Sequence, residues 1–217
     1  MRRFLWIFIF ALLFLGALIN FLLYQYRLND TFSRTRQRLI SIASDAALSI
    51  SAQEVLNVPL EQKSEGTPEY LAIYYKLEKI KKENLPFVKY IYIMTTTVRP
   101  GILQYVVDAD PVPQIITARC PTSLPGDKYD ARELPEMLEA YNGPSADRKI
   151  ATDVWGTFIS GYAPIRDTDG ATIAILGVDS DGASIQLMQK SAQMRGIIAL
   201  FTGLLFIISF ATLIKYH

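Results

Sequence analysis

The sequence predicts an α+β domain, with an antiparallel sheet and a long N-terminal helix, flanked by two transmembrane helices. Residues 4–24 and 196–214 are apolar and carry no charge, and each is long enough to cross a hydrocarbon core about 30 Å thick. Residues 25–195 have the polar composition and the length of one ordinary domain. Within them, strand-like runs lie between helical segments, which is typical of an α+β domain.

The first apolar helix, expected within residues 1–24, continues into a second helical pattern. No Gly or Pro interrupts residues 25–58, so we expect one helix that leaves the membrane and ends near Ala52. Its apolar residues form a heptad-like seam, which either packs on its own domain or pairs with a second copy of the chain. The seam consists of Leu28, Phe32, Thr35, Leu39, Ile42 and Ala46.

A second helix is predicted from Thr67 to about Asn84. Thr67 suits an N-cap and Pro68 suits the first turn of a helix. Leu85-Pro86 ends this helix. The polar residues 61–66 before it are expected to form a loop.

Four strands follow in two pairs. Residues 87–98 and 102–107 are rich in aromatic and β-branched side chains and are joined by a turn, which predicts a hairpin. Residues 157–165 and 171–178 form the second pair around an Asp-Gly turn. Gly177 inside the last strand predicts a bulge or a close backbone approach.

Between the two pairs, residues 111–152 are rich in Pro, Gly and Asp, with one short helical run at residues 133–141. Long excursions of this kind often cover a binding site. After the last strand, a helix is expected from Ala183 into the second apolar span, residues 196–214, which leaves residues 215–217 as a cytoplasmic tail.

Composition excludes several functions. The net charge is +1 and all 21 acidic residues lie between the apolar helices, so no basic surface for nucleic acid is expected. The single cysteine, Cys120, permits no internal disulfide and is expected to be a small buried hydrophobe. The single histidine, His217, is the last residue. Nucleophile, phosphate-loop and dinucleotide motifs are missing as well, so we expect no enzyme, no metal and no cofactor.

Two further points stay open. The pairs Asp108/Asp110 and Asp179/Asp181 are expected to be solvated turn aspartates, with a calcium site as the alternative. Basic residues are more numerous on the domain side of the apolar helices than on the terminal side. Applied by count alone, the positive-inside rule therefore favours a cytoplasmic domain. Long translocated domains weaken that rule. A cleaved signal peptide is an alternative for the first helix.

Residues 156–182, GTFISGYAPIRDTDGATIAILGVDSDG, resemble the last two strands of the extracytoplasmic Cache (PAS-like) sensor domains of bacterial receptors. The segments VVDADP and PGDKYDARELPEM are also similar to this family. The resemblance implies a PAS-like sheet at residues 25–195, placed outside the cytoplasm, with both chain ends inside. It further implies a multi-pass protein of the inner (cytoplasmic) membrane and a small ligand held between the sheet and its loops.

The candidate ligand-binding residues are mostly aromatic side chains on the predicted strands, for which core packing is the alternative. Arg119 is the expected anion partner within the excursion. In amino-acid-sensing relatives an aspartate near the final strand contacts the ligand amine, and Asp179 lies at a similar place. The R-x-W-Y element of those relatives is missing here, so the ligand class stays open. The full set is Tyr90, Tyr92, Tyr105, Arg119, Trp155, Phe158, Tyr162 and Asp179.

The function expected from these observations is that of a transmembrane sensor that relays ligand binding through its membrane helices. Only three residues follow Ile214, so we expect either a truncated receptor or a sensor-only subunit that signals through a cytoplasmic or membrane output partner. Membrane lipid and a second copy of the chain, forming a homodimer, are the other expected partners. The alternatives are a structural subunit without a ligand and a membrane-tethered enzyme. A stripe of small residues is a candidate helix–helix interface: Ala192, Gly196, Ala199 and Gly203.

Overall fold

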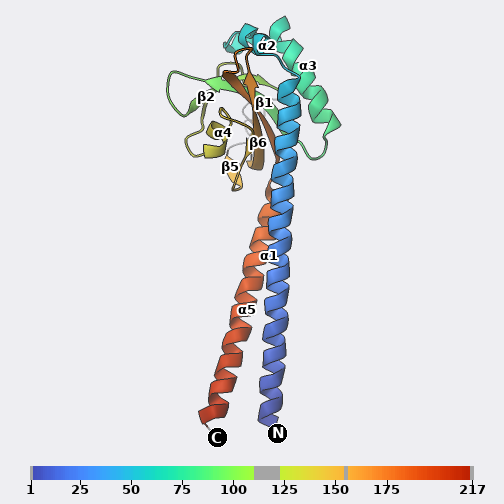
Figure 1. Ribbon diagram of the computed structural model, residues 1–217, viewed down its shortest axis with the longest axis vertical. Helices are drawn as coiled ribbons and strands as arrows, with labels where there is room; N and C mark the ends of the chain where they lie inside the picture. Colours follow the sequence, from blue (N-terminus) through green and yellow to red (C-terminus); the bar gives the residue numbers. More distant parts are fainter. Residues whose placement is uncertain (1, 110–122, 154–155, 216–217) are drawn as a thin grey trace. The chain divides into compact units, whose positions relative to one another are not determined.

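A computed structural model describes residues 2–109, 123–153 and 156–215. The chain forms two compact units, one made of residues 1–34 and 184–217 and the other of residues 35–183. The first unit is helical and the second contains the sheet (Figure 1). The α+β class, the antiparallel sheet and the long N-terminal helix predicted from the sequence are confirmed.

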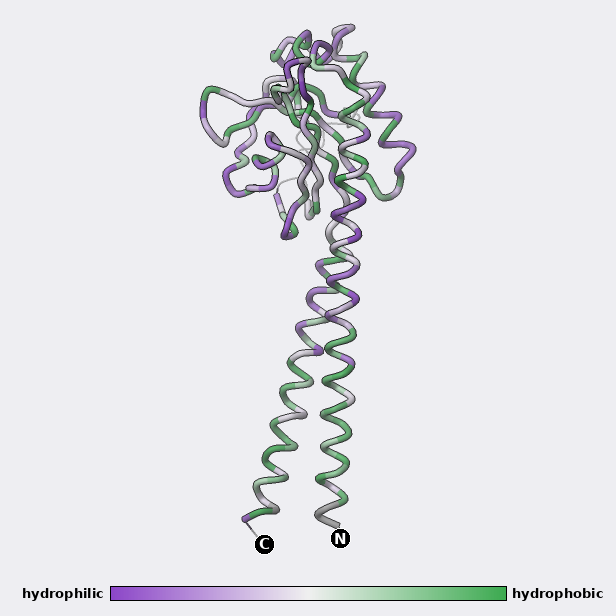
Figure 2. Tube along the Cα trace, viewed as in Figure 1, coloured by the Kyte–Doolittle hydropathy of each residue, from purple (hydrophilic) through white to green (hydrophobic). Residues whose placement is uncertain are grey.

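The first unit is made of parts of two long helices. Helix α1 spans Arg2–Leu48 and helix α5 spans Ala183–Lys215, and residues 2–34 of α1 and residues 184–215 of α5 belong to this unit. Both contain stretches that are long and apolar enough to cross a membrane, and only 0% and 11% of these stretches are buried within the protein. A core helix of a soluble protein would be mostly buried, whereas most of these two stretches is not buried. In Figure 2 both helices are coloured as hydrophobic toward the chain ends and as more hydrophilic toward the sheet.

The stripe of small residues packs against α1 of the same chain. A Cβ added at Gly196 would lie 3.1 Å from the Phe21 ring, and one added at Gly203 would lie 2.8 Å from the Phe14 ring. Small side chains therefore let α5 approach the phenylalanines of α1 closely. Phe14 also stacks on Phe206, with ring centroids 6.4 Å apart.

Helix α1 ends four residues earlier than expected. The prediction that it continues to Ala52 is wrong, because the backbone turns after Leu48 and Ser51 starts a new helix, α2 (Ala52–Asn57). Ser51 and Glu54 form a capping box, in which each side chain accepts a hydrogen bond from the other residue's backbone N–H. Capping residues inside an otherwise helical pattern thus divide it in two.

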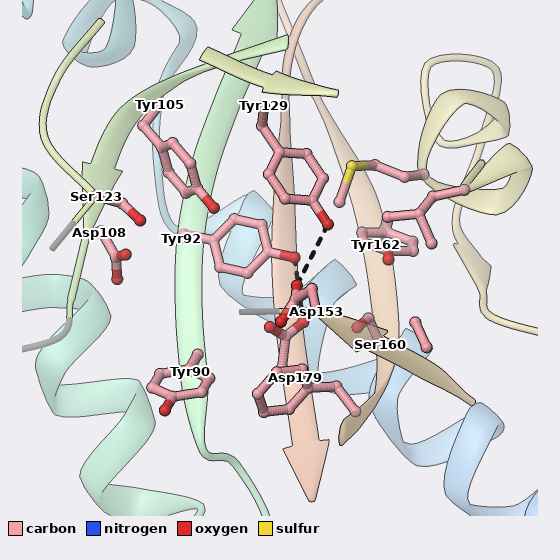
Figure 3. A pocket seen from close by; sticks show the side chains of 14 residues that line it. Tyr90, Tyr92, Tyr105, Asp108, Ser123, Tyr129, Asp153, Ser160, Tyr162 and Asp179 are labelled. Atoms are coloured by element: carbon pink, nitrogen blue, oxygen red, sulfur yellow. Dashed lines mark hydrogen bonds between the residues drawn. The ribbon is translucent and has the colours of Figure 1, made fainter. Parts of the chain in front are cut away.

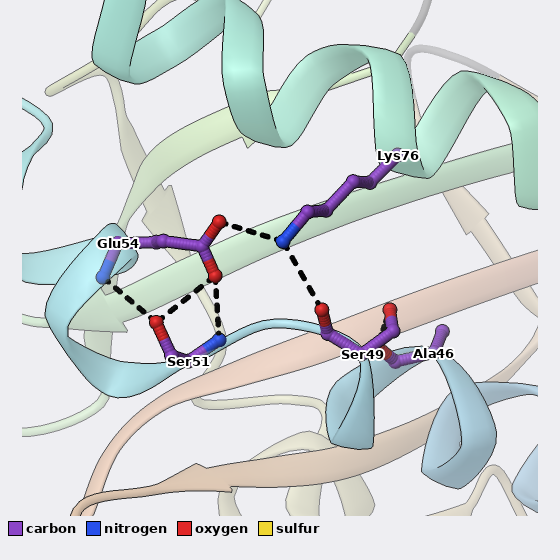
Figure 4. A network of polar contacts seen from close by, with 5 residues as sticks. All are labelled: Ala46, Ser49, Ser51, Glu54 and Lys76. Carbon is purple, nitrogen blue, oxygen red and sulfur yellow. Dashed lines mark hydrogen bonds and ion pairs between the residues drawn. The ribbon is translucent and has the colours of Figure 1, made fainter.

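A lysine of the next helix fastens this turn. Helix α3 spans Pro68–Glu83, and the predicted N-cap Thr67 accepts a hydrogen bond from the Tyr70 backbone. Lys76 of α3 contacts Glu54 over 2.6 Å and donates to the Ser49 carbonyl over 3.2 Å (Figure 4). The polar residues before α3, expected to be a loop, contain the 3-10 helix η1 (Gln62–Gly66).

The sheet is antiparallel, with the order β3-β2-β1-β7-β6-β4 and with β5 paired to β6. The two predicted strand pairs are present, and β7 of the second pair lies between β1 and β6. The helical run predicted at residues 133–141 contains helix α4, whereas strands β3, β4 and β5 were not predicted. The bounds are β1 Tyr90–Thr96, β2 Ile102–Asp108, β3 Lys128–Asp130, α4 Pro135–Glu139, β4 Ser145–Ala146, β5 Ala151–Asp153, β6 Gly156–Arg166 and β7 Thr172–Asp181.

The two faces of the sheet have different roles. Strand side chains alternate between faces. Gly161 of β6 lies against Leu39 of α1, so close that an added Cβ would be 2.6 Å from the Leu39 Cβ. Its neighbours Ser160 and Tyr162 point to the opposite face, where a second apolar cluster forms around Met137 of α4. That face holds the candidate site.

Candidate ligand-binding site

The sheet register aligns the site across three strands. Asp179 of β7 pairs with Tyr90 of β1 on one side and with Ser160 of β6 on the other. Two residues along, Gly177 pairs with Tyr92 and with Tyr162 in the same way. Because directly paired residues of antiparallel strands lie on the same face, the polar and aromatic side chains of both rows meet on one surface.

Gly177 creates the space in the middle of this surface. An added Cβ would lie 2.4 Å from the Tyr92 ring, so the ring occupies the volume that a side chain would fill. This is the close approach that a glycine inside the strand predicts. The Tyr92 hydroxyl thereby reaches the Asp179 carboxyl and donates a hydrogen bond over 3.1 Å.

A pocket lies over these rows (Figure 3). Its free volume is about 40 Å³, against about 10–15 Å³ needed for one water, so it has room for a small group. The described lining contains no Lys or Arg side chain. Its character comes from five tyrosines and three aspartates: Tyr90, Tyr92, Tyr105, Tyr129, Tyr162, Asp108, Asp153 and Asp179.

Burial dominates the electrostatics of Asp179. The side chain is 8% exposed, and loss of solvent raises its pKa to about 8. Hydrogen bonds from the Ser160 and Tyr92 hydroxyls lower the pKa, whereas the nearby carboxylates of Asp147 and Asp153 raise it. At neutral pH the carboxyl is therefore largely protonated until a positive charge enters the pocket.

A second buried carboxyl lies behind the pocket wall. Asp147 is 2% exposed, and burial raises its pKa to about 6. It accepts hydrogen bonds from the Ser160 backbone at 2.8 Å and from the Tyr162 hydroxyl at 3.1 Å. Ser160 thus lies between two carboxyls whose pKa values are both raised.

Burial keeps three of the pocket tyrosines neutral. Burial raises the pKa of Tyr92, Tyr105 and Tyr162 far above physiological pH, so their hydroxyls stay protonated and their rings stay uncharged. Tyr92 packs edge-on against Tyr105, with centroids 5.8 Å apart. Tyr129 approaches Asp153 through its hydroxyl at 3.5 Å. These rings form walls that present both π faces and hydroxyls.

Two rings at the pocket already hold a cation. The Lys89 ammonium lies 4.9 Å from the centroid of the Phe158 ring and 5.2 Å from that of Tyr90. Both distances fall within the range of a cation–π contact. These two rings are therefore already in contact with a lysine that is not part of the described pocket lining.

The structure brings most of the predicted site residues together. The residues that line this single pocket are Tyr90, Tyr92, Tyr105, Phe158, Tyr162 and Asp179. Arg119 and Trp155 lie outside the described residues, as does Cys120. Ligand contact by each of these residues stays a prediction.

Six polar residues of the site were not predicted as ligand-binding residues: Asp108, Ser123, Tyr129, Asp147, Asp153 and Ser160. Ser160 lies between Phe158 and Tyr162 in the period-two pattern of β6 and therefore on the same face. This pattern in the sequence could have identified Ser160 as a site residue. Tyr129 and Asp153 lie on three-residue strands, which are too short for a periodic signal. Asp147 follows the two-residue strand β4, and no local pattern marks it.

The expectation that Asp179 is a solvated turn aspartate is wrong, because its side chain is 8% exposed. Asp110 lies outside the described residues, and the calcium alternative has no support among the residues that are described. No group of three or more potential metal ligands occurs in the described part of the chain. Asp181 instead accepts a hydrogen bond from the Ala183 backbone at the start of α5, over 3.1 Å.

No family model and no curated protein sequence matches this chain. Solved structures of similar fold include the ligand-binding domain of the Campylobacter jejuni chemoreceptor Tlp3. With L-norvaline bound, that domain is 16% identical, with 81% of this chain and 62% of that chain covered and a TM-score of 0.49. With 4-methylisoleucine bound, the identity is 16%, the coverage 81% and 63%, and the TM-score 0.47.

A second similar structure is the sensor domain of Escherichia coli DcuS. It is 12% identical, the match covers 73% of this chain and 96% of that chain, and the TM-score is 0.46. The match to Tlp3 spans less than two thirds of that domain. At these values the similarity concerns the outline of the fold, and function follows from the pocket. The similar structures also include the Agrobacterium tumefaciens repressor BlcR, with 14% identity and a TM-score of 0.29. The Tlp3 and DcuS structures are sensor domains of the Cache, PAS-like class that residues 156–182 resemble.

Proposed function

We propose that this chain is a membrane-anchored sensor whose sheet domain binds a small molecule carrying an ammonium group. The observation that carries this proposal is the position of Asp179, a buried carboxyl at the floor of a pocket walled by tyrosines. The other carboxyl groups in the described lining, Asp108 and Asp153, add to its negative character.

Physical chemistry favours a cation at this place. A carboxylate loses much solvation on burial, and a paired positive charge restores part of it. An ammonium group next to Asp179 would keep that carboxyl ionised. The rings of Tyr92 and Tyr105, which also line the pocket, offer π faces that attract the same charge. An anion would instead be repelled by the aspartates of the described lining.

The strands of the pocket connect directly to both long helices. On β6, Ser160 and Tyr162 line the pocket while Gly161 between them lies against Leu39 of α1. On β7, Asp179 is followed within two residues by Asp181, which caps the start of α5. A ligand that binds two states of the sheet with different affinity would therefore shift both helices.

We further infer the topology of the sensor. The sheet domain lies outside the cytoplasm and both chain ends lie inside, in the inner membrane, and the helices pass the signal to an output partner. The apolar stretches of α1 and α5 support the two membrane crossings. A C-terminal alkaline phosphatase fusion is expected to be inactive. An active fusion would place the C-terminus outside and overturn this topology.

The homodimer also stays a proposal. In the structure the seam of α1 is partly used by its own chain, since Leu39 is 0% exposed and Ala46 is 2% exposed. Phe32 and Ile42 are half-buried. Cysteine crosslinking along α1 of the full chain in membranes tests the pairing. If no cysteine position along α1 gives a crosslinked dimer, the homodimer proposal is wrong.

Ligand binding is tested with the full chain in detergent. A panel of small amines, amino acids and carboxylic acids is screened by thermal shift, because a binder stabilises the folded state by mass action. We expect amine-bearing compounds to raise the melting temperature and Asp179→Asn to abolish this rise. Asp169→Asn, in an exposed turn, is the matched control. Stabilisation by carboxylic acids alone, or by amines in both variants equally, would contradict the proposal.

A further inference from the structure

A groove between α1 and α5 combines positive charge with an apolar wall. It lies within the helical unit, where Ala17 and Asn20 form its α1 side. Lys190, Ser191 and Arg195 supply the polar side chains of α5. No acidic residue is part of its described lining. The groove is therefore suited to an anion.

The groove lies where the apolar spans begin. Residues 4–24 and 196–214 carry no charge, so Lys190 and Arg195 stand just before the α5 span, on the side of the sheet domain. Ile198 and Ala17 belong to the spans themselves. The polar end of the groove thus falls at the headgroup level of a bilayer and its apolar end in the hydrocarbon, as basic residues near the ends of membrane helices are placed.

Arg195 is held in position by α1. Its guanidinium donates a hydrogen bond from Nη1 to Asn20 Oδ1 and lies 4.3 Å from the centroid of the Tyr24 ring. A guanidinium has five N–H donors, so this bond orients the group and leaves donors for a phosphate. The ammonium of Lys190 is exposed and forms no ion pair with any described residue.

The apolar wall distinguishes a lipid from a free anion. Leu187, Met194 and Ile198 are 64%, 58% and 53% exposed, and they share one face of α5 by their spacing of seven and four residues. A free phosphate would leave these side chains uncovered. The glycerol and the first acyl carbons of a phospholipid would cover Met194 and Ile198, which lie toward the span, while the phosphate reaches Lys190, Ser191 and Arg195.

We propose that this groove binds the headgroup of an anionic phospholipid in the leaflet next to the sheet domain. The positive-inside rule predicts few basic residues on the extracytoplasmic side of a membrane helix. A lipid headgroup site gives Lys190 and Arg195 a role on that side. It does not depend on what the pocket of the sheet domain binds. Binding there would hold α1 and α5 together through the groove that both helices line.

The test uses the full chain in detergent micelles and measures binding of phosphatidylglycerol by native mass spectrometry. Lys190→Gln is expected to weaken this binding about tenfold, because it removes a charge-assisted contact to the lipid phosphate. The control is Arg27→Gln, which removes one exposed charge from α1 outside the groove and is expected to leave binding unchanged. Phosphatidylcholine should bind more weakly, and inorganic phosphate should not displace phosphatidylglycerol.

Three outcomes would overturn the proposal. Equal binding by Lys190→Gln and the unaltered chain would remove the groove as the site. Equal losses in Lys190→Gln and Arg27→Gln would indicate general surface attraction. Displacement by inorganic phosphate would indicate a site for a free anion. Because Lys190 is exposed, unchanged thermal unfolding of the variant is expected and verifies that it folds.

Discussion

The Tyr92 hydroxyl lies 3.1 Å from Asp179 Oδ1. The Tyr92 ring reaches this position by passing over Gly177 of the neighbouring strand. Gly177 on β7 leaves open the volume into which the Tyr92 ring of β1 descends. The ring shields Asp179 from solvent while its hydroxyl satisfies one carboxyl oxygen. Gly177 therefore shapes the pocket around its central carboxyl by leaving room for the Tyr92 ring.

Gly177→Ala tests this arrangement. Its Cβ would meet the Tyr92 ring at 2.4 Å, so the ring is expected to move into the pocket and lose its hydrogen bond to Asp179. We expect the free energy of unfolding to fall by about 1–3 kcal/mol, as overpacked sites do, with amine binding lost. Chemical denaturation measures the first effect. Gly143→Ala, whose Cβ would meet nothing within 4 Å, should stay within about 0.5 kcal/mol.

Asp179→Asn is expected to weaken binding of an ammonium ligand at least about tenfold, a loss of about 1.4 kcal/mol or more. Asparagine keeps the size of the side chain but cannot carry the negative charge that the ligand needs. Isothermal titration calorimetry with an amine identified by the screen measures the change. Unaltered affinity in Asp179→Asn would show that the ligand does not contact this residue.

The stability of the ligand-free chain should depend on pH through Asp179. The folded-state pKa is about 8 and the unfolded one is near 4, so between these values the folded state binds more protons. The free energy of unfolding is therefore greatest below about pH 4 with respect to this group and falls as the pH rises to about 8. Asp147 has a folded-state pKa of about 6, so it also lowers the free energy of unfolding as the pH rises, between about pH 4 and pH 6.

Asp179→Asn separates the two carboxyls. The decline in stability between about pH 6 and pH 8 should vanish in this variant, whereas the decline below pH 6 should remain because Asp147 is unchanged. Urea denaturation at a series of pH values gives both slopes. An identical decline above pH 6 in both proteins would assign the effect to another group.

Binding of an ammonium ligand should release a proton. Below about pH 8 the free pocket holds Asp179 largely protonated, and pairing with a cation favours the ionised form. The affinity is expected to rise with pH up to about 8 and then level off. Calorimetry in buffers of different ionisation enthalpy counts the released proton, and no dependence on the buffer at pH 6.5 would contradict the coupling.

Gly161→Ala probes the connection between the pocket and α1. Its Cβ would lie 2.6 Å from the Leu39 Cβ and 2.7 Å from the Leu39 carbonyl carbon. The second of these atoms is backbone, so the helix must move away from β6. We expect a loss of about 2 kcal/mol or more in the free energy of unfolding. Hydrogen exchange should rise in residues 35–48 first, and a uniform rise across the sheet would argue against a local separation.

The elements that could be predicted from the sequence are those with a long local signal. The first hairpin, β6, β7 and the Thr67 cap of α3 all rest on patterns of many residues or on a specific capping pair. The break of α1 at Leu48 was missed because Ser51 and Glu54 fit a continuing helix as well as a new one. The short strands β3, β4 and β5 exist only through pairing with β2 and β6.

By itself, the sequence determined the two apolar helices, the four long strands and an aromatic surface that includes Asp179, because burial in lipid and in a sheet requires long runs of suitable side chains. Only the tertiary structure decided that Tyr129, Asp153 and Asp147 gather around Asp179 and that its pKa is raised to about 8. Those features arise from neighbours on separate strands. Register and burial are set by the whole sheet and not by any one segment.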